Sequence, residues 1–284
     1  MPSHDLIHRY GTWARSEGHA DSTISDRLRI LTRLDEELPY GADYASEDDL
    51  RDWLWRDRSG QTKTGRDWSV GTRETYHGAV AHFYHWAAEV IQELEFNPAA
   101  DIPRPEPEER LPNPVTDEQL QAALDRACEP YLTWIKLAAY AGLRCIDIAQ
   151  LHRERVTQQT VKVLASKGGA ARIIPTHPII WDALATLPPG PVTGHDRRQI
   201  SMRSWVYFHR TLKLNGVRMH RFRHWFGTQV QRQYRDLLVT QQLLGHKNPK
   251  TTAGYALVVA EQKREAIDLL PVFAGVPLGE LTVG

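Results

Sequence analysis

The sequence predicts a mostly α-helical protein of two domains with one small β-hairpin. Three observations lead to this prediction. Apolar residues recur at helical spacing through the first hundred residues, a proline-rich stretch follows them, and a Lys-Gly-Gly tripeptide beyond it lies between two β-rich runs. At 284 residues, with 41% hydrophobic and 25% charged residues, the chain has the composition of a soluble globular protein and is long enough for two hydrophobic cores.

Residues 1–100 are expected to form a helical domain. Segment 22–38 places four apolar side chains at helical spacing: Ile24, Leu28, Leu31 and Leu34. A second helix should follow Ser46, because Ser46 and Asp49 have the spacing of a capping box. Segment 69–94 is a third long amphipathic candidate.

A linker is expected at residues 101–114, where prolines are dense. Proline fixes φ and lacks an N–H donor, so it favours extended chain over helix. The second domain, residues 115–270, should begin with a helix capped by Thr116. It should continue with a helix ending at Gly142, a hairpin within 160–177 and helices at 204–214, 219–234, 237–244 and 260–270. The tail, residues 271–284, is apolar and interrupted by Gly and Pro, which is typical of a docking segment.

Charge is distributed unevenly, although the formal net charge is zero. Residues 151–250 hold 17 Lys and Arg against 4 Asp and Glu, a net charge of +13. Residues 1–150 hold 16 basic and 27 acidic side chains, a net charge of −11. This asymmetry indicates an anionic partner for the basic segment, with a solvated basic face as the alternative.

The sequence shows no secretion signal and no apolar stretch approaching the ~18 residues that span a membrane. Two cysteines, Cys128 and Cys145, are too few for a disulfide framework or a zinc cluster. We therefore expect a cytoplasmic protein.

Several polar residues indicate phosphate chemistry. In a helix, His220, Arg223 and His224 share one face. Two histidines four residues apart also occur in zinc sites, but the glutamate of that motif is absent here, and the other alternative is a plain basic face. Arg144 should project from the corner after Gly142.

Three further residues complete this set. Asp147, in the first turn after the corner, could orient Arg144 or simply cap its helix. Lys167, at the hairpin tip, could swing onto a ligand or be a solvated turn residue. Tyr255 follows His246 by nine residues, among small side chains.

Together these residues suit displacement at a phosphodiester. Guanidinium groups bind phosphate oxygens bidentately and keep their charge. A tyrosine of pKa ~10 is only ~0.1% ionised at pH 7, a deficit of roughly 4 kcal/mol that a cationic pocket and a histidine can reduce. A lysine can protonate the leaving 5′-oxygen. Such catalysis depends on positioning and electrostatics, so no metal or cofactor is expected.

In these motifs the sequence resembles the tyrosine recombinases, also called phage-type integrases. The motifs are AGLRCIDIAQL, SKGGAARIIP, HRFRHWFGT and LGHKNPKTTAGYAL, and they occur in the family's order across the second domain. The small helical first domain resembles the family's core-site-binding domain in character and position. Phe222 stands where leucine is usual, and His246 where some members carry tryptophan.

The resemblance implies a role for each residue. Arg144 and Arg223 would clamp the scissile phosphate, Lys167 would be the general acid, and His220 would assist as general acid/base. His246 would be a second phosphate donor, Tyr255 the nucleophile of a 3′-phosphotyrosine intermediate, and Asp147 a supporting acid. In the first domain the candidates for DNA phosphate contact are Arg29, Lys63, Arg66 and Arg73.

The implied partner is double-stranded DNA with inverted-repeat core sites, exchanged through a Holliday junction by a homotetramer on two sites. An accessory DNA-bending or directionality factor is a possible further partner. The tail from Pro271 would dock on a neighbouring protomer, with packing on its own chain or a disordered end as alternatives. Because the first predicted helix begins almost at Met1, we expect no additional arm-binding domain.

We expect a compact integrase of a phage or mobile element, with resolution of chromosome dimers as the alternative. A type IB topoisomerase uses a similar residue set, but the linker and small helical domain favour a recombinase. A non-catalytic DNA-binding regulator is disfavoured because every catalytic position holds a competent residue. A metal-dependent nuclease is disfavoured because the sequence offers no carboxylate cluster.

Overall fold

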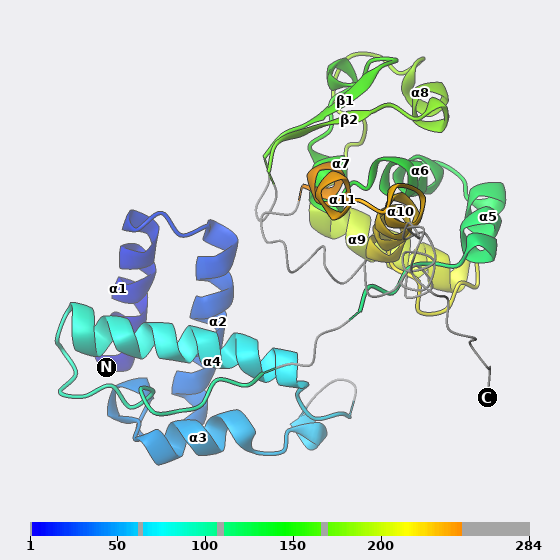
Figure 1. The fold of residues 1–284 in the computed structure, drawn as a ribbon. Coiled ribbons are helices and arrows are strands. Elements are labelled where there is room, and N and C mark those ends of the chain that lie inside the picture. The colour runs from blue at the N-terminus through cyan, green and yellow to red at the C-terminus, as the bar shows by residue number, and fades with distance from the viewer. Residues whose placement is uncertain (1, 62–64, 107–110, 166–169, 246–284) are drawn as a thin grey trace, which may run out of the picture. The chain divides into compact units, whose positions relative to one another are not determined.

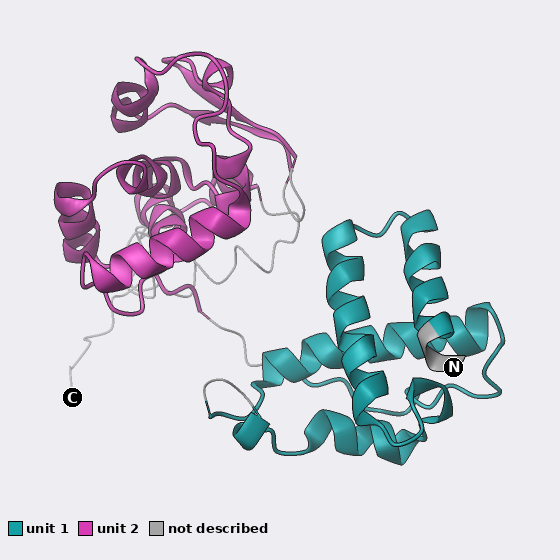
Figure 2. Ribbon diagram, turned by 180° about the vertical axis from the view of Figure 1, so that it is seen from behind, with its two compact units in different colours: residues 1–109 teal, residues 110–284 magenta. Residues whose placement is uncertain are grey.

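The computed structural model describes residues 2–61, 65–106, 111–165 and 170–245. It divides the chain into two compact units, residues 1–109 and 110–284 (Figure 2), and the division lies within the stretch that the sequence marks as a linker. The helix expected at 260–270 and the tail lie outside the described residues. Four candidate site residues also lie outside them: Lys63, Lys167, His246 and Tyr255.

The first unit is helical (Figure 1). Its helices are α1 (Pro2–Ser16), α2 (Asp21–Glu37), α3 (Glu47–Trp55) and α4 (Val70–His85), with 3-10 turns η1 (Ala42–Tyr44) and η2 (Ser59–Gln61). Helices α1 and α2 lie side by side, and α4 packs across α2. The largest fully buried side chains of its hydrophobic core are aromatic: Tyr10, Trp53, Phe83, Tyr84 and Trp86.

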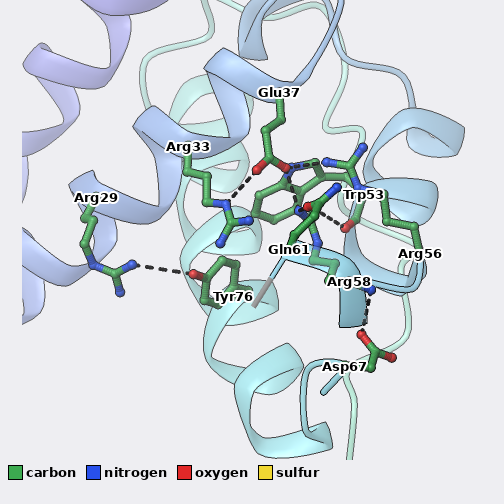
Figure 3. Close-up of polar contacts among 9 residues, drawn as sticks. All are labelled: Arg29, Arg33, Glu37, Trp53, Arg56, Arg58, Gln61, Asp67 and Tyr76. Atoms are coloured by element: carbon green, nitrogen blue, oxygen red, sulfur yellow. Dashed lines mark hydrogen bonds and ion pairs between the residues drawn. The ribbon is translucent and has the colours of Figure 1, made fainter. Parts of the chain in front are cut away.

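A polar cluster around Glu37 connects α2 to the chain that follows α3 (Figure 3). The Glu37 carboxylate accepts hydrogen bonds from four side chains, Arg33, Trp53, Arg56 and Arg58. The guanidinium of Arg58, which is fully buried, lies 4.1 Å from the ring centroid of Trp68. Burial opposes ionisation of Glu37, but the hydrogen bonds from Arg33 and Arg58 outweigh it and lower the pKa of Glu37 to about 2.

The second unit contains seven helices and two strands within its described residues. They are α5 (Asp117–Arg126), α6 (Tyr131–Ala141), α7 (Cys145–Ala149), β1 (Thr160–Val163), β2 (Arg172–Pro175), α8 (Pro178–Leu184), α9 (Arg197–Arg210), α10 (Met219–Tyr234) and α11 (Leu237–Leu244), with a 3-10 turn η4 (Arg153–Arg155). Helix α6 packs against both α10 and α8. The core includes Trp134 of α6, Phe208 of α9 and Phe222 of α10.

The predicted hairpin is confirmed. Strand β1 pairs antiparallel with β2, and Val163 lies opposite Arg172. Val161, Val163 and Ile174 point into the core while their neighbours face outward, as the two-residue period of a strand requires. The pairing therefore runs from Thr160 opposite Pro175 to Val163 opposite Arg172.

The mostly helical fold class with a small sheet is confirmed, and so are the predicted caps. The Ser46 hydroxyl accepts the Asp49 N–H and the Asp49 carboxylate accepts the Ser46 N–H, which forms a capping box. Thr116 and Gln119 form a second box at the start of α5. Within the described residues no helix is long and apolar enough to cross a membrane.

Two details differ from the sequence expectations. The helix expected over 69–94 is α-helical only in α4, and it continues as a π turn, η3 (Trp86–Val90). It stops before Gln92, which has a φ of 54°. Helix α8 was not predicted at all. It begins with Pro178 at the first helical position, and the Nδ1 atom of His177 accepts the Ile179 N–H.

Candidate active site

The corner between α6 and α7 positions Arg144. Gly142 ends α6 with a φ of 60°, and a Cβ atom added there would lie 2.6 Å from a ring carbon of Phe226. Only glycine fits this left-handed, close-packed position. Arg144 is the N-cap of α7, and its N–H donates to the Asp147 carboxylate at 3.1 Å. The chain therefore turns sharply at Arg144, as the sequence predicts.

Asp147 has a second partner that the sequence did not indicate. Its carboxylate forms an ion pair with Arg172 of β2 at 3.0 Å, and the two side chains are 0% and 5% exposed. The sequence suggested that Asp147 orients the Arg144 guanidinium. Asp147 binds the Arg144 backbone N–H and the Arg172 guanidinium, so it joins the α7 corner to the hairpin.

Helix α10 carries His220, Arg223 and His224. Arg223 is completely buried and donates hydrogen bonds to the carbonyl oxygens of Gly142 and Leu244, the latter at 2.8 Å. It therefore connects α10 to the corner before Arg144 and to the end of α11. Phe222 and Phe226 are buried on the adjoining face, as expected from the helical period.

Both histidines of α10 are neutral at pH 7. Burial of the ring, followed by repulsion from Arg223 and Arg144, lowers the pKa of His220 to about 4. Burial, followed by repulsion from His220 and Arg223, lowers the pKa of His224 to about 3. The two rings are in edge-to-face contact, with centroids 4.4 Å apart. These effects show that Arg144, His220 and Arg223 are close enough to interact electrostatically.

Two arginines hold the C-terminal end of α11. Arg172 Nε donates to the Leu243 carbonyl at 2.9 Å, and Arg223 donates to the next carbonyl, that of Leu244. Gly245 caps the helix with a φ of 64°. Cations at a helix C-terminus satisfy its last carbonyl groups and complement its dipole. The segment that begins at His246 therefore starts from a firmly held helix end.

Neither cysteine chemistry nor a metal cluster emerges from the described part of the chain. No group of three or more His, Cys, Asp and Glu side chains there has the arrangement of a metal site. Burial raises the pKa of Cys145, next to Arg144, to about 11, so its thiol stays protonated at neutral pH and is a poor nucleophile.

Known proteins with similar sequences and folds are recombinases. No family model matches the chain. It is 27% identical over 208 residues to tyrosine recombinase XerC of Staphylococcus saprophyticus, covering 64% of this chain and 69% of that protein. It is 27% identical over 196 residues to tyrosine recombinase XerD of Vibrio vulnificus, covering 60% and 64%. The alignments thus span about two thirds of these relatives.

The fold agrees with this similarity. A lambda integrase tetramer bound to a Holliday junction superposes with a TM-score of 0.69 at 17% identity, covering 89% of this chain and 76% of that one. The chain is therefore similar to tyrosine recombinases in sequence and to an integrase in fold. Within it, Arg223 of α10 bonds to the corner that carries Arg144, and both arginines lower the pKa of His220.

The candidate DNA contacts of the first unit differ in their surroundings. Arg29 and Arg66 are exposed. Arg29 also lies 3.5 Å from the Tyr76 hydroxyl (Figure 3). Arg73 is buried, pairs with Asp67 at 2.6 Å and donates to two backbone carbonyls, so it is committed to the protein interior and is a poor candidate for phosphate contact.

Sequence reasoning missed two features of this protein. The first is Arg172, whose partners lie 25 and 71 residues away in the chain, beyond the reach of any local pattern. The second is the exposed face of α9. This helix contains no Asp or Glu within its bounds and exposes four arginines that a local charge count would have identified: Arg197, Arg198, Arg203 and Arg210.

Proposed function

We propose that this chain is a site-specific DNA recombinase that cuts and rejoins strands through a 3′-phosphotyrosine intermediate. The observation that supports this most directly is the hydrogen bond from Arg223 to the Gly142 carbonyl, which joins α10, the helix that carries His220, to the corner that carries Arg144. Lys167, His246 and Tyr255, which the family resemblance assigns to the same site, supply the remaining groups.

In the proposed cleavage step, the Tyr255 hydroxyl oxygen attacks the scissile phosphorus. The P–O5′ bond breaks as the Tyr–O–P bond forms, so the number of phosphate ester bonds is conserved. His220 or a nearby acceptor takes the phenolic proton, and Lys167 gives a proton to the leaving 5′-oxygen. Religation is the reverse, with a 5′-hydroxyl attacking the phosphotyrosine. Bond energy is retained, so no nucleotide is consumed.

The two arginines would stabilise the charge of the displaced phosphate. A guanidinium has five N–H donors, so Arg223 can hold a backbone carbonyl and a phosphate oxygen together. Burial of the ring, together with the same positive charge, keeps His220 neutral before DNA arrives. An incoming phosphate would offset that charge and raise the pKa of His220. Asp147 would keep Arg144 in place through the α7 cap.

The proposed substrate is double-stranded DNA with inverted-repeat core sites, acted on by four protomers. The similarity to an integrase tetramer on a Holliday junction supports this assembly, as does the basic segment 151–250. The proposed reaction is integration and excision of a phage or mobile element, aided by an accessory DNA-bending or directionality factor. The first unit would bind the core site, and the C-terminal tail would dock on a neighbouring protomer. A cytoplasmic location follows from this role.

Covalent trapping tests the proposal. The protein is incubated with pooled host and element DNA in EDTA, the reaction is stopped with SDS, and the attached DNA is sequenced. We expect adducts at one short inverted-repeat site. They should be lost in Tyr255→Phe and retained in Tyr234→Phe, which removes the hydroxyl of an exposed tyrosine at the end of α10.

Each other outcome identifies a different function. A site in the host chromosome that recombines only with its own copy would indicate dimer resolution. Adducts scattered without sequence preference would indicate a type IB topoisomerase. Tight DNA binding with no adduct above the Tyr255→Phe background, even with accessory extract, would overturn the proposal in favour of a DNA-binding regulator.

A further inference from the structure

Arg172 occupies a junction between three parts of the second unit. It is the first residue of β2, and its side chain is 5% exposed. Its Nη2 atom pairs with the buried Asp147 carboxylate at 3.0 Å, and its Nε atom donates to the Leu243 carbonyl at 2.9 Å. One guanidinium thus links the hairpin, the α7 corner and the end of α11.

The backbone around this junction is closely packed. The N–H of Ala170 lies 3.4 Å from the carbonyl oxygen of Gly245, so the hairpin strand itself meets the end of α11. A Cβ atom added to Gly245 would lie 2.9 Å from Cδ of Arg172 and 3.3 Å from the Ala170 carbonyl oxygen. The positive φ of Gly245 and this close approach both require glycine there. The position of Arg172 is therefore fixed from several sides.

The partners of Arg172 adjoin residues assigned to the reaction. The same Asp147 oxygen that binds Arg172 also accepts the Arg144 N–H. Lys167 precedes Arg172 by five residues on the same hairpin. A displacement of one end of this linkage would therefore change the placement of the hairpin relative to the Arg144 corner.

We propose that Arg172 is a positioning residue that fixes the hairpin bearing Lys167 against the Arg144 corner, so that the general acid meets the phosphate that Arg144 binds. This inference rests on the proposed function. Arg172 does not touch DNA in this account, and it acts through Asp147 and Leu243. The planar guanidinium is needed because one group must donate hydrogen bonds to a carboxylate and to a carbonyl at fixed angles. The ammonium group of lysine cannot reproduce this geometry.

The test compares two leaving groups. Arg172→Lys keeps the positive charge beside Asp147 and removes the planar guanidinium with its fixed donors. Single-turnover cleavage is measured on a duplex that carries the trapped site, with either the normal 5′-oxygen or a bridging 5′-sulfur at the scissile phosphate. A thiol has a far lower pKa than an alcohol (~8.5 for cysteine), so a thiolate leaves without a general acid. The sulfur substrate thus removes the requirement for Lys167.

We expect Arg172→Lys to cleave the oxygen substrate about 100-fold more slowly, the scale of a misplacement of roughly 1 Å. Cleavage of the sulfur substrate should stay within a few-fold of wild type, and DNA affinity should be unchanged. Arg153→Lys is the matched control. Arg153 also donates to two backbone carbonyls of the second unit, those of Val156 and Ala185. It should cleave both substrates at the wild-type rate.

Asp147→Asn changes the other partner of the same ion pair. It should likewise slow cleavage of the oxygen substrate and not of the sulfur substrate. This variant tests the inference if Arg172→Lys does not fold. Equal defects on both substrates would overturn the inference, because they would show general damage to the site. Full activity of Arg172→Lys on oxygen would overturn it as well. If wild type formed no Tyr255-dependent adduct on either substrate, the proposed function itself would fall.

Discussion

Burial and nearby positive charge together determine the protonation of His220. Arg144 comes from the corner before α7, and Arg223 lies one turn along α10, so two separate segments contribute to one electrostatic environment. Burial of the ring disfavours a protonated imidazole most, and repulsion from the two arginines adds to the cost. His220 is therefore a neutral proton acceptor at physiological pH until a phosphate joins the cluster.

Titration of His220 by NMR should give a midpoint about pH 4 in the protein without DNA. Arg144→Gln should raise that midpoint by about one unit, because it removes one like charge. Arg126→Gln, on the exposed surface at the end of α5, should leave it unchanged. The signal is assigned by its loss in His220→Gln. A midpoint near 6.5, or one that does not respond to Arg144→Gln, would contradict the proposed cluster.

At the scale of secondary-structure elements, arginine side chains and glycine caps connect the segments. Arg223 connects α10 to the ends of α6 and α11, Arg172 connects β2 to α7 and α11, and Gly142 allows Phe226 to approach the corner. In the first unit, Glu37 at the end of α2 collects hydrogen bonds from the residues around α3. These connections fix elements that are distant in sequence.

Glu37→Gln should reduce the free energy of unfolding of the first unit by about 2–3 kcal/mol at pH 7, since three arginines lose their counter-charge. The pKa of Glu37 is lowered to about 2 in the folded state, so its contribution is complete above about pH 5 and is lost as pH falls towards 2. Denaturant unfolding at pH 7 and pH 3 should therefore show a smaller difference from wild type at pH 3.

Glu47→Gln is the control for that measurement, since Glu47 forms an exposed pair with Arg51 one helical turn away. Exposed pairs of this kind contribute little to stability. The account of the Glu37 cluster would be contradicted if both variants had equal stability, or if the effect of Glu37→Gln grew as the pH was lowered.

Local chemistry explains which elements the sequence could predict. The caps at Ser46 and Thr116 are formed by side chains three residues apart, so a short window contains all the information. The corner at Gly142 and the Lys-Gly-Gly hairpin likewise depend on local backbone preferences. Helix α8 was missed because its seven residues are too few to display a helical period.

The site was predictable to the extent that its residues carry recognisable motifs. Arg144, His220 and Arg223 each lie on an element that local pattern predicts, and the two arginines lower the pKa of His220. The pairing of Asp147 with Arg172 was not predictable, because it depends on how the hairpin packs against α7. The burial of Arg73 also depends on tertiary contacts, with Trp55 and Asp67.

At the scale of the whole molecule, net charge conceals the expected DNA-binding surface. The chain is neutral overall, yet residues 151–250 have a net charge of +13. Within that segment, α9 exposes Arg198, Arg203 and Arg210. A neutral protein with one basic surface can bind DNA strongly while its acidic parts remain in solvent.

DNA affinity should therefore depend steeply on salt. If 6–10 phosphates are neutralised, the affinity should fall by ~10³–10⁵ between 50 and 200 mM salt. Replacing Arg198, Arg203 and Arg210 by Gln should reduce the slope of log affinity against log salt by roughly three. Arg51→Gln, in the acidic first half of the chain, should leave the slope unchanged. A slope near zero for wild type would exclude the basic segment as the binding surface.

The most direct test of the central claim is to identify the residue bound to DNA. The covalent adduct is digested with protease and nuclease, and the peptide that retains a nucleotide is sequenced by mass spectrometry. Of the 10 tyrosines in the chain, the account predicts modification of Tyr255 alone, through a 3′-phosphate. A nucleotide on any other residue, or attached through its 5′-phosphate, would contradict the proposed mechanism.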